Sequence, residues 1–196
     1  MAAGTSDKIL NVAEKLVQSR GFNAFSYEDV SKAVGIRKAS LHYHFATKAD
    51  LGVALIGRYR ENFLDALGGI EEGTSDSRRR LQRYAALYGT VLRKKRMCMC
   101  GMLATDAATL PKAMRDSVTV FFDENAAWLA RVLEDGRKRK EIDFDGTAQA
   151  MASFFVSSLE GAMLVAYGSG RYGTFDAAAE RLLATVRPRR KARDGR

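Results

Sequence analysis

The sequence predicts an all-α protein with a small three-helix domain at the N-terminus and a larger helical domain after it. Apolar residues recur at intervals of three and four along most of the 196-residue chain, as on one face of a helix. The chain has only two prolines, and no segment alternates apolar and polar residues as a strand does. Capping residues and glycines divide the N-terminal part into short helices.

The first expected helix covers residues 6–20 and ends at Gly21, a residue that suits a helix C-terminus. Its apolar stripe consists of Ile9, Val12, Ala13, Leu16 and Val17. Ser26 and Asp29 have the spacing of a capping box, so a second helix should begin there. Gly35 then allows a sharp turn, because glycine adopts positive φ at little cost.

A third helix is expected over about residues 38–45, with Leu41 and Phe45 facing inward. Its other side is basic, hydroxyl-bearing and aromatic, and contains no acidic residue. Two short helices joined by a tight turn are typical of a helix-turn-helix, whose second helix enters the major groove of double-stranded DNA. An ordinary helical hairpin with a solvated polar face is the alternative.

The candidate DNA contacts fall into two groups. Base edges suit side chains at the start of the third helix, and phosphates suit the N-termini of the neighbouring helices. The candidates for base edges are Arg37, Lys38, Ser40 and His42, those for bases or backbone are Tyr43 and His44, and those for phosphates are Ser26, Tyr27 and Lys48.

The remaining helices define the larger domain. Thr47 and Asp50 repeat the capping-box spacing and begin a long helix that we expect to end at Gly68 and Gly69. Further helices are expected from about Leu81 to Leu92, from Pro111 to Gly136, from the cap Asp145 to Gly168, and over residues 174–186. We therefore divide the chain into a helix-turn-helix domain (1–50), a helical domain (51–186) and a basic tail (187–196).

The charge distribution agrees with nucleic-acid binding without establishing it. The formal net charge is +9, and residues 187–196 contain six basic side chains and one acidic one. Such a tail is typical of a disordered end, or of an arm that contacts phosphates. A helical scaffold that binds acidic partners through this tail is a second interpretation. We find no apolar run that suggests a membrane span and no signal-peptide layout, which favours the cytoplasm.

Cys98 and Cys100 are the only cysteines, and they lie in a methionine-rich segment after the basic run 93–96. Residues two apart on a helix point in different directions and do not pair easily. The segment is typical of flexible core filling. The basic neighbours leave open a thiol that senses electrophiles or oxidants, and a metal thiolate is a third alternative.

Enzymatic chemistry is not expected. His42 and His44 are the only histidines, and residues two apart on a helix do not face each other, so we predict no metal site. The chain contains no glycine loop of the kind that holds phosphates and no arrangement of a nucleophile with a base. No cofactor is predicted.

Several short residue motifs between residues 5 and 51 match a known family pattern in their order and spacing. They are Gly21-Phe22, Gly35-Ile36, Lys38-Ala39-Ser40-Leu41, His44-Phe45 and Thr47-Lys48. With them, this quarter of the chain resembles the DNA-binding domain of TetR/AcrR-type transcriptional repressors. The family commonly has glycine where Ala39 stands, tyrosine where His42 stands, and serine or threonine where Arg37 stands. Individual base contacts are therefore not transferred.

The resemblance implies a homodimer that binds a palindromic operator and is released by a small molecule. It also implies that the last two long helices form the dimer and that a ligand cavity lies among the C-terminal helices. The candidates for its lining are Phe121, Phe122, Trp128, Met151, Phe155, Leu159 and Met163. The apolar stripes of these C-terminal helices contain no cluster of charged residues, which favours an apolar or aromatic effector.

Overall fold

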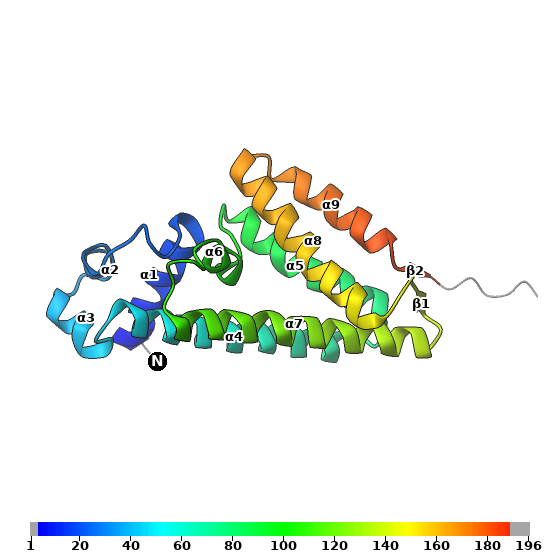
Figure 1. The fold of residues 1–196 in the computed structure, drawn as a ribbon, viewed down its shortest axis with the longest axis horizontal. Coiled ribbons are helices and arrows are strands. Elements are labelled where there is room, and N and C mark those ends of the chain that lie inside the picture. Colours follow the sequence, from blue (N-terminus) through cyan, green and yellow to red (C-terminus); the bar gives the residue numbers. More distant parts are fainter. Residues whose placement is uncertain (1–3, 189–196) are drawn as a thin grey trace, which may run out of the picture. The chain divides into compact units, whose positions relative to one another are not determined.

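The computed structural model describes residues 4–188, and this part of the chain is almost entirely helical (Figure 1). The helices are α1 (Thr5–Arg20), α2 (Tyr27–Val34), α3 (Lys38–His44), α4 (Lys48–Gly73), α5 (Ser77–Arg93), α6 (Met99–Thr105), α7 (Lys112–Lys138), α8 (Ala148–Ser169) and α9 (Gly173–Ala184). Two short antiparallel strands, β1 (Ile142–Asp143) and β2 (Arg187–Pro188), pair with each other. The predicted all-α class is confirmed. Most of the basic tail lies outside the described residues.

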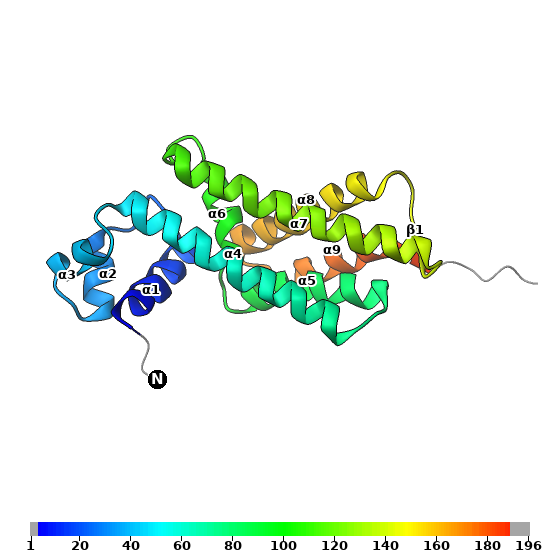
Figure 2. The same ribbon diagram turned by 90° about the horizontal axis from the view of Figure 1, so that it is seen from below.

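The described residues form two compact units. One consists of residues 4–65 and 91–121, where α1 packs against α2 and α6, and α2 packs against α3. The other consists of residues 66–90 and 122–188, where α8 and α9 pack against each other (Figures 1 and 2). The division of the chain at residues 50 and 186 remains a prediction.

Local sequence signals set the N-terminal helices. Ser26 and Asp29 form a reciprocal capping box, in which the Ser26 amide donates to Asp29 Oδ2 (2.7 Å) and the Asp29 amide donates to Ser26 Oγ (3.3 Å). Thr47 and Asp50 repeat this exchange at 2.9 and 3.1 Å. Gly35 ends α2 in the left-handed conformation, with φ of +78°. The predicted caps and turn are confirmed.

Several predicted helix ends were wrong. α4 continues through Gly68 and Gly69 to Gly73, and α7 continues through Gly136 to Lys138. A Cβ at position 136 would lie 2.6 Å from Ser77 Cβ and 2.7 Å from Ile142 Cδ1, so this glycine allows close packing instead of ending a helix. The N-cap of α8 is Thr147, whose hydroxyl accepts from the amide of Ala150.

Two features were missed entirely. The short helix α6 lies in the sulfur-rich segment, for which no helix was predicted. Among the described helices, α8 is long and apolar enough to cross a membrane by length and composition, contrary to the expectation of no such run. A core helix of a soluble protein meets the same criteria; in α8, 33% of the apolar window is buried, including Phe155, Leu159 and Met163.

Candidate nucleic-acid interface

The helix α3 presents one face to solvent and one to the core. Leu41 is fully buried and Phe45 is nearly so, which fixes the inner side. Tyr43 is 87% exposed. The other predicted contacts on and before α3 are exposed as well, except for the half-buried Ser40; they are Arg37, Lys38, His42 and His44. The structure therefore brings the predicted base-contacting side chains together on one open surface.

This surface is free of acidic side chains along the chain from Ile36 to Thr47. Positive and aromatic side chains on a short exposed helix suit the phosphate-lined major groove. The imidazole Nδ1 of His42 lies 3.0 Å from the carbonyl oxygen of Ala46. A carbonyl only accepts, so Nδ1 bears the proton, and in the neutral ring Nε2 is left as an acceptor. Such an acceptor suits the amino groups of adenine or cytosine.

Tyr27, a predicted phosphate contact, lies inside the helix-turn-helix. Its hydroxyl is 2.9 Å from the carbonyl oxygen of Phe45 and 2.5 Å from that of Thr47. Burial, followed by the charge of Asp50, raises the pKa of Tyr27 to about 12. The neutral phenol thus holds the segment that connects α3 to α4. Ser26 remains exposed, and its hydroxyl donates to Asp29 in the capping box.

Lys48, also a predicted phosphate contact, turns its ammonium towards the connector between α1 and α2. Nζ donates to the carbonyl oxygens of Phe22 and Phe25, both at 2.5 Å, and lies 4.5 and 4.2 Å from the two ring centroids. Burial lowers the pKa of Lys48, with partial compensation from the charges of Asp106 and Asp29.

The predicted ligand-lining residues are distributed over several places. Phe121 lies in the first unit, where its ring is 5.2 Å from that of Phe63. Trp128, Phe155, Leu159 and Met163 are buried in the second unit.

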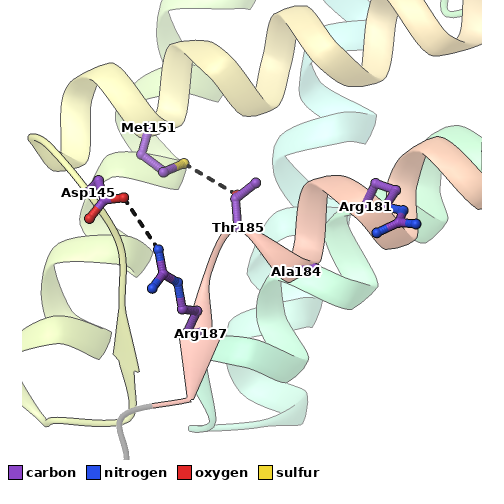
Figure 3. Close-up of a pocket in the computed structure, with 6 residues that line it drawn as sticks. All are labelled: Asp145, Met151, Arg181, Ala184, Thr185 and Arg187. Carbon is purple, nitrogen blue, oxygen red and sulfur yellow. Dashed lines mark hydrogen bonds and ion pairs between the residues drawn. The ribbon is translucent and has the colours of Figure 1, made fainter.

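Two surface pockets in the second unit contain the remaining candidates. Phe122 borders a pocket of about 360 Å³ between α7 and α8. Met151 borders another of about 310 Å³, shown in Figure 3, where Thr185 Oγ1 donates to its sulfur at 3.8 Å. An exposed ion pair between Arg187 and Asp145 (3.4 Å) closes one side of this pocket. Of the six candidates in the second unit, Phe122 and Met151 border these two pockets, one each.

Sequence reasoning missed a polar cluster beside Trp128. The indole of Trp128 stacks on Tyr84 with centroids 5.6 Å apart, and its buried Nε1 has no hydrogen-bond partner among the described residues. Tyr84 Oη lies 3.0 Å from Tyr88 Oη and 3.4 Å from Asn125 Oδ1. Asn125 within the apolar stripe of α7 is the signal that could have revealed this cluster, because buried amides need partners.

The two thiols are buried, with 2% of Cys98 and none of Cys100 exposed. The hydroxyl of Tyr59 lies 3.6 Å from Cys98 Sγ. A reagent in solution has no direct path to either sulfur in this conformation, which favours the core-filling interpretation over the thiol sensor.

Comparisons with known proteins agree with the helix-turn-helix geometry. The family model described as "Bacterial regulatory proteins, tetR family" matches residues 9–55, and the model described as "Tetracyclin repressor-like, C-terminal domain" matches residues 78–182. The second match alone covers more than half of the chain.

Similar proteins support the same assignment. A TetR-family transcriptional regulator from Agrobacterium tumefaciens is 34% identical and has a TM-score of 0.89, over 92% of this chain and 96% of that one. A TetR regulator from Legionella pneumophila is 30% identical and has a TM-score of 0.87, over 95% and 100%. The HTH-type transcriptional repressor NemR of Escherichia coli K12 is 24% identical over 170 residues, 83% of each chain. The chain therefore belongs to the TetR family of DNA-binding transcriptional regulators, which are not enzymes.

Proposed function

We propose that this regulator is a cytoplasmic repressor that binds a palindromic operator as a homodimer and is released by a small molecule. The observation that carries the proposal is the outer face of α3. It is exposed, basic and aromatic, with Leu41 and Phe45 anchoring its other side. In the major groove, Arg37 and Lys38 would reach guanine edges or phosphates, and Tyr43 would contact bases or backbone. Ser40, His42 and His44 complete the proposed reading surface.

The outer face of α8 supports a homodimer. Phe154, Leu164 and Val165 are 49%, 47% and 64% exposed. With 3.6 residues per turn, positions 154, 161, 164 and 165 fall within an arc of about 100° of the helix. Gly161, between them, has open space where a side chain would lie. Contiguous exposed apolar surface of this kind indicates a protein interface, and a second copy of the chain related by a two-fold axis would cover it.

A two-fold dimer accounts for a palindromic operator. One short reading helix spans only a few base pairs, so two copies of α3 about 34–36 Å apart are needed to read successive major grooves. A ligand that binds more tightly to a conformation in which the two copies of α3 are spaced differently would release the DNA. The shift is set by the difference in its affinity for the DNA-binding and the released conformations.

We place the effector in the second unit, most of which lies within residues 78–182, the range matched by the model "Tetracyclin repressor-like, C-terminal domain". The buried Trp128, Phe155, Leu159 and Met163 favour an apolar or aromatic effector. Phe122 and Met151, also in the second unit, remain candidate lining residues, and Phe121 remains a candidate in the first unit.

The test is a DNase I footprint of the purified protein on the DNA upstream of its own gene and on duplexes selected from a random pool. We expect protection of a symmetric sequence, which disappears on addition of a fitting member of a panel of hydrophobic and aromatic compounds. If the selected duplexes share no sequence and bind no better than random DNA, specific operator binding is refuted. A protected site without symmetry would contradict the dimeric mode of binding.

A further inference from the structure

The connector of residues 21–25, between α1 and α2, is held by side chains from two other parts of the first unit. The Phe22 amide donates to Asp106 Oδ2 at 2.9 Å, and the Asn23 side-chain amide donates to Thr109 Oγ1 at 2.8 Å. The Phe22 carbonyl accepts from Lys48. The amide of Phe22 is thus bound by a carboxylate and its carbonyl by an ammonium, and both charged residues are distant from Phe22 in the sequence.

Close packing accompanies these bonds. Gly21 has φ of +86°, and a Cβ at this position would lie 3.3 Å from Asp106 Oδ2. The rings of Phe22 and Phe25 meet edge to face at 5.7 Å, and both face the Lys48 ammonium. The connector has no regular secondary structure, so its conformation depends on these side chains.

Lys48 also links this connector to the segment that follows the reading helix α3. It is the first residue of α4, directly after the segment whose carbonyls bind the Tyr27 hydroxyl. Tyr27 is the first residue of α2, so α2, α3 and the start of α4 are linked through backbone carbonyls. Asp106, the C-cap of α6, holds the connector that leads into α2.

We propose that Asp106 and Lys48 are positioning residues for operator binding, which act through the backbone of residues 22–25 and touch no DNA. The inference rests on the proposed function. Lys48 uses its ammonium on two carbonyls, and its removal would leave both of them without a charged donor. Asp106 has the wrong charge for a phosphate contact, so an effect of its removal on affinity must be transmitted through the connector.

Salt dependence of operator affinity separates positioning from direct contact. A lost phosphate contact lowers the slope of log K against log salt concentration by about 1, whereas a lost positioning contact lowers affinity at unchanged slope. For Lys48→Met, which retains the apolar stem, we expect about tenfold weaker binding or more at unchanged slope, as for a lost charge-assisted hydrogen bond.

For Asp106→Ala we expect a loss of similar size, although removing a negative charge would strengthen binding by Coulomb attraction alone. Asp106→Asn retains an acceptor for the Phe22 amide and should recover most of the affinity. The double variant Lys48→Met/Asp106→Ala should lose less than the sum of the single losses, because both act on one connector. Asp116→Ala, which removes an exposed carboxylate paired with Lys112, is the matched control and should bind as the wild type does.

Hydrogen exchange provides a local readout independent of DNA. The Phe22 amide should lose protection in Asp106→Ala and retain it in Asp106→Asn, at unchanged helix content. The inference is overturned if Lys48→Met lowers the salt slope by about 1, or if Asp106→Ala binds operator like the wild type. A wild-type protein that binds no DNA specifically would contradict the proposed function itself.

Discussion

The hydroxyl of Tyr27 at the start of α2 lies 2.9 Å from the carbonyl oxygen of Phe45, at the end of the reading helix. Phe45 is the C-cap of α3, where backbone carbonyls lack helical partners. One buried phenol therefore both satisfies a helix end and fixes the angle between the two helices of the helix-turn-helix.

Replacing Tyr27 with phenylalanine should destabilise the protein by about 1–3 kcal/mol, because a buried carbonyl loses its donor. The variant should melt at a lower temperature and bind operator less tightly. Thermal unfolding followed by circular dichroism, with operator titration at a temperature where both proteins are folded, measures the two effects. Equal melting temperatures would show that this bond contributes nothing to stability.

The pKa of Tyr27 adds a pH-dependent signature. Its folded-state value, about 12, lies above the ordinary value of 10.0, so the neutral phenol is favoured in the folded state. This contribution to stability is complete below pH 10 and is lost as the pH rises towards 12, because the unfolded chain releases the proton first. Urea unfolding at pH 9 and pH 11 should show a larger decrease for the wild type than for Tyr27→Phe. An equal decrease would contradict the raised pKa.

Tyr43→Ala should weaken operator binding and leave stability and the dimer unchanged, because the ring is almost fully exposed and contributes little to packing. Titration of a labelled operator measures affinity, and thermal unfolding measures stability. Tyr172→Ala, at the start of α9, is the control for loss of a tyrosine away from α3. Unchanged affinity would remove Tyr43 from the DNA contacts.

Local signals explain why the helix-turn-helix could be predicted from sequence. A capping box spans four residues and the Gly35 turn spans two, so residue types within a short window determine them. The same reasoning could not locate the ammonium of Lys48 or the phenol of Tyr27. Their partners lie 26 and 18 residues away, and no periodicity in the sequence connects those segments.

The ligand residues illustrate a different limit. An apolar stripe predicts burial, and Trp128, Phe155 and Met163 are buried as the stripes suggest. It does not predict which stripes face one cavity, because that depends on packing between helices far apart in sequence. Gly136 shows the same ambiguity, since glycine suits both a helix end and a close helix contact, and only the tertiary structure distinguishes them.

The buried thiols should react slowly with Ellman's reagent in the native state and rapidly after denaturation in guanidinium chloride. Cys98→Ser and Cys100→Ser separate the two contributions, since each variant retains one thiol. We expect native rates at least about a hundredfold below those of the denatured chain, because reaction then requires local opening. Rapid native reaction of either thiol, together with release of operator DNA, would support a thiol sensor instead.

Gly136→Ala should destabilise the second unit by about 1–3 kcal/mol, because the new methyl group would overlap with Ser77 and Ile142. Gly68→Ala is the matched control: position 68 also lies within a helix, but its Cβ would meet nothing within 4 Å. There alanine should stabilise by up to about 1 kcal/mol through helix propensity. Chemical denaturation measures both changes, and a stabilising Gly136→Ala would contradict the close contact.

Val165→Asp should disrupt the proposed dimer, because it places a charge at the most exposed apolar position of the α8 face that a second copy would bury. Sedimentation velocity should show a monomer at concentrations where the wild type is dimeric, and affinity for a full palindrome should fall to that for a single half-site. Val120→Asp changes an exposed valine on α7, outside this face, and should remain dimeric. An aspartate is tolerated at a position that stays exposed to water in the dimer. If Val165→Asp remains dimeric and Val120→Asp dissociates, the interface therefore does not include this face of α8.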